Sequence, residues 1–275
     1  MSNCLFCEKG ADSCEHAIPQ WVHRRIAPES KGKYPVYVGR FLSGKGYIEE
    51  RHHVSTAFTA KIVCQACNSG WMSKMESEVK GILAPFTQES FPILAHTYLE
   101  TLKDHKAILA RWMVKTALLN SYALPGKISL PRSLIHEIVT AGPPGGVWLD
   151  AAKAKDSGIA AALTKTFPTI NGRYFVGSQT HTGGGCFQFC LQINQLLLRV
   201  GMTIGAEIGY VAHSGLNPFR LFPLADRQVP EFHEFNDINH FMHSILLRTW
   251  DGCPGEVPLS QGETRLSTVT DRVIS

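Results

Sequence analysis

Cys64-Gln65-Ala66-Cys67 is the second of two CxxC pairs in the chain, and Cys4-Leu5-Phe6-Cys7 is the first. A CxxC turn presents two thiolates to one tetrahedral zinc ion, so two such turns complete a closed site with four sulfur ligands. Because four sulfur ligands leave no coordination position for a substrate, the predicted zinc is structural. The interval between the pairs is long for a zinc ribbon, and we expect it to hold a folded segment or a long loop.

Disulfide bonds are the alternative use of the eight cysteines. Disulfide frameworks are typical of short secreted chains, whereas this chain has 275 residues and shows no pattern of a secretion signal. Zinc is therefore the preferred interpretation of the two CxxC pairs. The other cysteines have no such pairing and are predicted to be core thiols: Cys14, Cys186, Cys190 and Cys253.

The composition is that of an ordinary soluble protein, with 44% hydrophobic and 18% charged residues. The length suits one large or two modest domains, and we expect a first domain over residues 1–85 and a second over residues 86–275. No run reaches the roughly 18 apolar residues of a membrane-spanning helix. We therefore expect a cytoplasmic protein without a membrane partner.

A Glu15-His16 dyad lies between the two CxxC pairs, and Asn68 directly follows the second pair. Hydrolysis of a phosphodiester needs a water molecule that is deprotonated near neutral pH, and histidine, with an ordinary pKa of about 6.5, suits this task. It also needs a cation to neutralise the scissile phosphate. Oxygen ligands such as those of Glu15 and Asn68 match the preference of Mg²⁺ or Mn²⁺.

These motifs together resemble a known family. The combination of Cys4-x-x-Cys7, Glu15-His16-Ala17-Ile18-Pro19 and Val63-Cys64-x-x-Cys67-Asn68 is similar to HNH endonucleases of the zinc-containing ββα-metal type, in particular the subgroup with an EHxxP first motif. The resemblance covers residues 1–80. It implies a metal-dependent DNA endonuclease in which His16 is the general base, while Glu15 and Asn68 hold the catalytic divalent ion. A role in bacterial or phage restriction or defence follows by analogy only.

The chain departs from the family at the middle asparagine, which ties the loop between the two strands and orients the base. Residues 17–63 contain no asparagine. Four polar residues are candidates to replace it, and ordinary loop positions are the alternative for each: His52, His53, Ser55 and Thr56. The missing residue keeps a second function open, that of a catalytically inactive, zinc-stabilised nucleic-acid-binding or interaction module.

Basic residues between the dyad and the second CxxC pair favour a nucleic-acid partner. The net charge is only +4, but Arg24, Arg25 and Arg51 lie close in sequence to the candidate site, and His52 and His53 follow directly. We expect these five residues to contact the phosphate backbone of DNA, with a solvated basic loop as the alternative. RNA is not excluded, because this hydrolysis does not itself require deoxyribose.

A helix over residues 70–80 is predicted to complete the first unit, because Met72, Met75 and Val79 repeat at three and four residues. Glu76 lies about two helical turns past Asn68 and could reach the catalytic ion. A solvent-facing salt bridge is the favoured interpretation of Glu76, and the metal role is the alternative.

The rest of the chain predicts helices followed by strands. Helical spacing extends over residues 87–123, and a short helix is expected over residues 131–140. Strand patterns follow at residues 147–149, 173–177, 186–193 and 196–206, and residues 231–250 have a helical pattern. The polar end, residues 254–275, is expected to be mobile.

The predicted fold class is therefore α+β, with an N-terminal ββα-metal unit, a helical segment and an antiparallel-sheet C-terminal domain. This second domain carries no catalytic motif. We expect it to serve substrate recognition or to form a homodimer.

Overall fold

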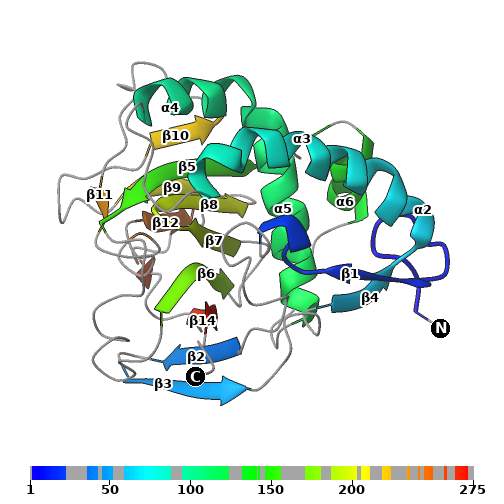
Figure 1. The fold of residues 1–275 in the computed structure, drawn as a ribbon, viewed down its shortest axis with the longest axis horizontal. Coiled ribbons are helices and arrows are strands. Elements are labelled where there is room, and N and C mark those ends of the chain that lie inside the picture. The colour runs from blue at the N-terminus through cyan, green and yellow to red at the C-terminus, as the bar shows by residue number, and fades with distance from the viewer. Residues whose placement is uncertain are drawn as a thin grey trace.

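A computed structural model of the chain describes the following residues: 2–22, 36–42, 45–51, 59–87, 95–123, 132–140, 142, 146–155, 171–180, 187–202, 206–210, 219–223, 234–235, 241, 245–249, 257–258 and 264–271. Helices and mostly antiparallel strands alternate in blocks along these residues (Figure 1). The fold class is thus α+β with a cysteine cluster near the N-terminus, which confirms the coarse part of the prediction.

Two short strands carry the N-terminal motifs. β1 (Ser13–His16) and β4 (Thr59–Val63) pair in antiparallel fashion, with Ser13 opposite Val63 and His16 opposite Thr59. The register shifts between Ser13 and Glu15, which is the position of a bulge. Bulges redirect side chains next to functional sites, and this one immediately precedes the Glu15-His16 dyad.

A helical run follows β4 directly and consists of α2 (Gln65–Cys67), η3 (Asn68–Met72) and α3 (Ser73–Leu83). Gly70 has φ −88° and ψ −112° inside η3, so the run bends there. Met72, Met75 and Val79 are buried on one face, as their spacing predicted. The helix expected over residues 70–80 is therefore present, although α3 begins three residues later than expected, and the ββα-metal unit stays a prediction.

Three helices form the next block: α4 (Ala95–Asp104), α5 (Lys106–Ala123) and α6 (Arg132–Thr140). The helical spacing over residues 87–123 thus corresponds to two helices, and the short third helix is also confirmed. Successive residues of α5 such as Trp112, Met113 and Val114 are fully buried, so this helix is enclosed on several sides. It packs against α3, α6 and β4 on one side and against the large sheet on the other (Figure 1).

The large sheet has nine strands among the described residues. Eight follow the order β10 (Phe219–Phe222), β5 (Val147–Ala154), β8 (Leu196–Met202), β7 (Phe187–Ile193), β6 (Asn171–Thr180), β14 (Thr264–Asp271), β2 (Val36–Leu42) and β3 (Lys45–Arg51). Neighbours along this path are antiparallel, as expected, and only the ninth strand, β11 (Glu234–Phe235), pairs in parallel with β5. Asn194 has φ +49° in the two-residue turn between β7 and β8, a conformation that asparagine tolerates well.

One hydrophobic core connects these parts. It runs without interruption from Phe6 beside the cysteines through Leu83 of α3 and Leu109 of α5 to Leu198 of β8. The core therefore crosses residue 85, and the division into domains at residues 1–85 and 86–275 stays a prediction.

The C-terminal quarter differs from the sequence prediction. Of the described residues within 231–250, Glu234–Phe235 (β11) and Ile245–Thr249 (β12) are strands rather than the expected helix, whereas Phe241 is helical. β12 pairs with β9 (Ala206–Tyr210) and β13 (Val257–Pro258). Short apolar runs such as Ile245-Leu246-Leu247 suit either structure, and pairing decides between them. The predicted strand over residues 196–206 is divided between β8 and β9. The polar end contains β13 and β14, so it is not simply a mobile tail.

None of the helices in the described part of the chain is both long and apolar enough to span a membrane.

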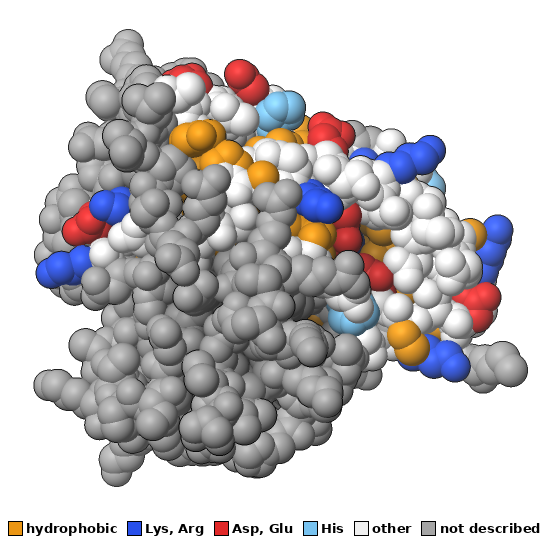
Figure 2. Space-filling view, viewed as in Figure 1, with side chains coloured by type: hydrophobic (Ala, Val, Ile, Leu, Met, Phe, Trp, Pro, Cys, Tyr) orange, Lys and Arg blue, Asp and Glu red, His pale blue; other side chains and the backbone are white. Residues whose placement is uncertain are grey.

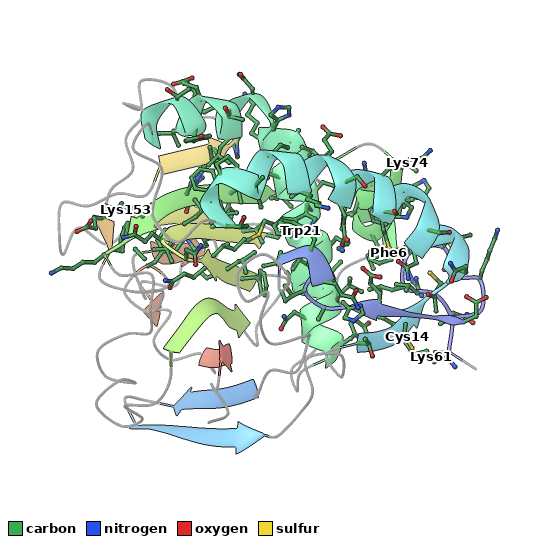
Figure 3. The ribbon with its side chains drawn as sticks, viewed as in Figure 1. Phe6, Cys14, Trp21, Lys61, Lys74 and Lys153 are labelled. Carbon is green, nitrogen blue, oxygen red and sulfur yellow. The ribbon has the colours of Figure 1, made fainter. Side chains whose placement is uncertain are left out.

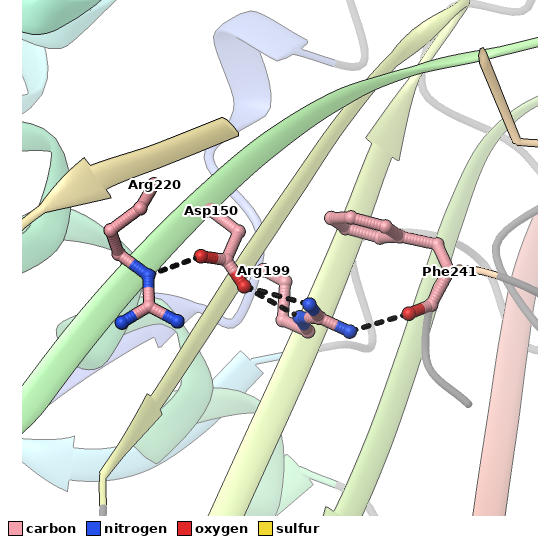
Figure 4. Close-up of polar contacts among 4 residues, drawn as sticks. All are labelled: Asp150, Arg199, Arg220 and Phe241. Atoms are coloured by element: carbon pink, nitrogen blue, oxygen red, sulfur yellow. Dashed lines mark hydrogen bonds and ion pairs between the residues drawn. The ribbon is translucent and has the colours of Figure 1, made fainter. Parts of the chain in front are cut away.

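Asp150 joins three strands of the large sheet through a buried charge cluster (Figure 4). It lies opposite Arg199 of β8 and Arg220 of β10, and its carboxylate accepts hydrogen bonds from both, at 2.7 Å from Arg199 Nη2 and 2.5 Å from Arg220 Nε. Arg199 and Asp150 are fully buried. The Arg199 guanidinium also lies over the rings of Trp148 and Phe241, at 5.4 Å and 4.5 Å from their centroids. These contacts offset part of the large cost of removing the charges from water.

Asp150→Asn is expected to lower the free energy of unfolding by about 3–5 kcal/mol, because two guanidinium groups lose their buried counter-charge. Urea unfolding of the zinc-loaded protein measures the change. Glu234→Gln is the control, since it removes the exposed β11 partner of Lys153, a residue on the same strand as Asp150, and should cost no more than about 1 kcal/mol. Equal effects of the two substitutions would contradict the assigned role of Asp150.

Candidate functional site

The four cysteines of the two CxxC pairs converge in one cluster. Their sulfur atoms lie within 4.8 Å of one another, and Cys7 Sγ is 3.4 Å from Cys64 Sγ. Cys4, Cys64 and Cys67 are buried, and Cys7 is partly exposed. Among the described residues, this is the only group of three or more His, Cys, Asp and Glu side chains that converge well enough to hold a metal ion. The four-sulfur donor set is consistent with structural zinc, as the spacing predicted.

Local hydrogen bonds bring the two pairs together. The N–H of Leu5, within the first pair, donates to the carbonyl of Ile62 on β4 at 2.8 Å, which fixes the first turn against the strand that leads to the second pair. Asp12 Oδ1 accepts from the N–H of Gln65 at 2.7 Å and so satisfies a free donor at the start of α2. Phe6 meets Trp71 edge to face with ring centroids 5.2 Å apart, which closes the cluster on its apolar side.

The thiols of this cluster differ in acidity. Burial raises the pKa of Cys67 strongly, and burial is also the main cause of the raised pKa of Cys7. Burial would also raise the pKa of Cys64. Hydrogen bonds from the backbone N–H of Cys67 and from the neighbouring thiols have a larger, opposite effect and lower the pKa of Cys64 to about 7. One thiolate is therefore readily formed, whereas four adjacent thiolates require a cation to neutralise them.

Glu15 and Asn68 lie near each other, and their role as ligands of a divalent ion stays a prediction. Glu15 is buried on the same face of β1 as Ser13, and the Asn68 amide donates to Ser13 Oγ at 2.8 Å. Burial raises the pKa of Glu15 and Glu76 raises it further, whereas Lys115 and Asn68 oppose the shift. The structure thus connects the first motif to the residue after the second CxxC pair.

Glu76 joins this group from α3 through a buried lysine. Its Oε1 forms a short ion pair with Lys115 Nζ, and the same ammonium lies 3.6 Å from Glu15 Oε1. The favoured interpretation of Glu76, a solvent-facing salt bridge, is therefore wrong, because its partner is fully buried. Whether Glu76 binds a metal ion stays a prediction.

His16 lies on the other face of β1. Ser13 and Glu15 are the buried positions of this strand, while Cys14 is exposed and His16 is intermediate, which follows the alternation of a strand. His16 Nε2 is 2.9 Å from Gln20 Nε2, so Gln20 holds the imidazole ring in place.

The alternation of buried and exposed residues along β1 also explains why the prediction of a core thiol is wrong for Cys14. It is confirmed for Cys190, which is fully buried and whose pKa burial raises to about 12. Cys186 and Cys253 lie outside the described residues.

The predicted substrate-contacting residues are mostly outside the described part of the chain. This applies to Arg24, Arg25, His52 and His53, and also to Ser55 and Thr56. Arg51 is the last residue of β3, opposite Val36, and the hairpin that contains it belongs to the large sheet. Over α3, Figure 2 shows Lys, Arg, Asp and Glu side chains interspersed rather than a patch of one sign. The predicted DNA contacts therefore stay predictions.

Lys115 is the residue of this site that the sequence prediction missed. It is a lone charge within the apolar stretch Trp112–Leu119, and a lysine in such a place is almost never buried unless it is paired. That pattern was the available signal, but it does not identify the partners. One turn before Lys115, Trp112 packs against Trp21 with ring centroids 6.3 Å apart, so α5 also contacts the segment that follows the dyad (Figure 3).

Comparison of the chain with models of protein families gives no match. Comparisons with curated proteins and with solved structures give no match either. The resemblance to HNH endonucleases therefore depends on the motifs of residues 1–80 alone. Any assignment of function has to be argued from the side chains around Glu15 and the cysteine cluster.

Proposed function

We propose that the protein is a metal-dependent endonuclease that hydrolyses phosphodiester bonds of DNA. The observation that supports this most is the position of Glu15 beside Asn68, on a strand, strand and helix unit next to a four-cysteine cluster. The cellular setting we propose is bacterial or phage restriction or defence in the cytoplasm, with the second half of the chain serving substrate recognition or a homodimer.

Each part of the site has a separate task in this proposal. The four cysteines hold structural zinc, which keeps β1, β4 and α2 together. Glu15 and Asn68, with Glu76 as a further ligand, would hold Mg²⁺ or Mn²⁺, and their oxygen atoms fit such a hard cation. When bound, this ion neutralises charge on the scissile phosphate. His16, which lies on the face of β1 opposite Glu15, would accept the proton of the attacking water, and Gln20 orients its imidazole ring.

The charges around Glu15 favour a cation. Two carboxylates, Glu15 and Glu76, face one ammonium, Lys115, so the group carries one negative charge when both carboxylates are ionised. Glu15 and Glu76 are mostly buried, where the attraction of such a charge for a cation is stronger than in water.

A zinc-stabilised nucleic-acid-binding or interaction module without catalysis is the second candidate. Within the described residues, no second group of His, Cys, Asp and Glu side chains converges as the cysteines do. The family's middle asparagine is also missing from residues 17–63. Both observations favour a protein that has kept its zinc-stabilised fold and lost the ability to cleave nucleic acid.

Incubation with supercoiled plasmid separates the two candidates. The zinc-loaded protein is freed of other ions by dialysis rather than with a chelator, so that the cysteine site stays filled. Mg²⁺ or Mn²⁺ is then added. Nicking that needs the added ion and disappears in Glu15→Gln supports the endonuclease. A gel shift without nicking under either ion, with one zinc still bound per chain, supports the module. Parallel reactions with structured RNA and single-stranded DNA identify the preferred substrate.

A further inference from the structure

Lys115 is the feature of the site that the proposed mechanism does not use. It lies in the middle of α5 with 0% of its surface exposed, among the buried residues Trp112, Val114 and Thr116. A buried ammonium is stable only with nearby counter-charges, because removing it from water is very costly. Its counter-charges are the two carboxylates nearest to the proposed catalytic ion.

The ammonium approaches these carboxylates from their inner side. It pairs with Oε1 of Glu15 and Oε1 of Glu76, while side-chain exposure increases from 0% in Lys115 to 11% in Glu15 and 19% in Glu76. Solvent, an ion or a substrate therefore reaches the pair from the side away from Lys115. For this reason, Lys115 does not touch a reacting atom and is not a catalytic residue.

Three separate segments meet at this point. Glu15 comes from β1, Glu76 from α3 and Lys115 from α5, and α5 packs against both α3 and β4. Without Lys115, two mostly buried carboxylates would face each other with no positive charge between them. Like charges at such distances repel strongly, so the ammonium determines whether the pair can form before any ion binds.

We propose that Lys115 is a positioning residue, a fixed internal cation that holds Glu15 and Glu76 together and weakens their affinity for a divalent ion. This inference rests on the proposed function, because it concerns the same ion site. A protein typically binds Mg²⁺ through one or two carboxylates completed by substrate phosphates. A weakened site fills effectively only when a phosphate adds its own oxygen ligands. Lys115 thus makes ion binding dependent on the phosphodiester substrate.

Titration of the zinc-loaded full chain with Mn²⁺ tests the proposal, with free Mn²⁺ measured by electron paramagnetic resonance. Lys115→Gln removes the charge but still donates a hydrogen bond, and it should bind one Mn²⁺ on the order of tenfold more tightly than the wild type. Lys115→Arg keeps the charge and should stay near the wild-type affinity. The double variant Lys115→Gln with Glu15→Gln should lose the gain. Zinc content, followed in each sample, shows that Mn²⁺ has not entered the cysteine site.

An affinity of Lys115→Gln equal to or weaker than that of the wild type would overturn the proposal. If this variant is unfolded without added ion, Mn²⁺ should restore its near-ultraviolet circular dichroism, because the ion replaces the missing charge. A variant that stays unfolded in Mn²⁺ would also overturn the proposal. Failure of the wild type to nick plasmid would reject the endonuclease instead, and the Mn²⁺ affinities would still decide the role of Lys115.

Discussion

Cys64→Ala is expected to abolish zinc binding and to unfold the segment that carries Glu15. Structural zinc contributes on the order of 10 kcal/mol of apparent folding free energy in small units of this kind. Cys64 is also the N-cap of α2, where its sulfur accepts from the N–H of Cys67 at 3.4 Å. The substitution therefore removes both a metal ligand and the cap of the helix that begins the run to α3. Elemental mass spectrometry and urea unfolding measure the two losses.

Cys14→Ala is the matched control for this experiment. Cys14 belongs to the same N-terminal unit, but it is exposed and is not part of the four-cysteine cluster. We expect this variant to keep one zinc per chain and to unfold at the wild-type urea concentration. Retention of zinc and of wild-type stability in Cys64→Ala would show that the cluster does not hold a structural ion.

His16→Ala is expected to eliminate plasmid nicking while the fold stays intact. If His16 is the general base, its loss should reduce the rate by about 10²–10⁴-fold, the usual contribution of a positioned base. His16 is only partly buried at the end of β1, so its truncation should change the free energy of unfolding little. Nicking rates at saturating Mg²⁺ and urea unfolding of the same preparation measure the two effects separately.

His105→Ala provides the matched control, because it makes the same substitution at a partly exposed histidine between α4 and α5. His105 lies 4.0 Å from the exposed Glu78 and is not part of the candidate site. Its nicking rate should equal that of the wild type. Cleavage by His16→Ala at the wild-type rate would show that another group removes the proton, and the base would then have to be sought elsewhere.

The sequence predicted the features that depend on local spacing. Two residues between the cysteines of each pair place both sulfurs at one turn, and the repeat of Met72, Met75 and Val79 places one face of α3 in the core. These patterns are properties of a few consecutive residues. They were therefore readable before any fold was known.

Errors arose where a short segment suits more than one structure. Ile245–Thr249 pairs as a strand with β9, although its apolar residues also fit a helix. The spacing of apolar residues over so short a run carries too little information to decide between the two. Pairing with a distant strand supplies the missing constraint.

Residue types and their spacing by themselves determined the four-cysteine cluster and most of the helices. Only the tertiary structure decided what the buried charges do. Lys115, Asp150 and Arg199 were visible as lone charges in apolar runs, but their partners lie on strands and helices far away in sequence. A buried charge requires a partner, and that requirement can be read from a sequence. The identity of the partner depends on which elements pack together, and this is a property of the whole fold.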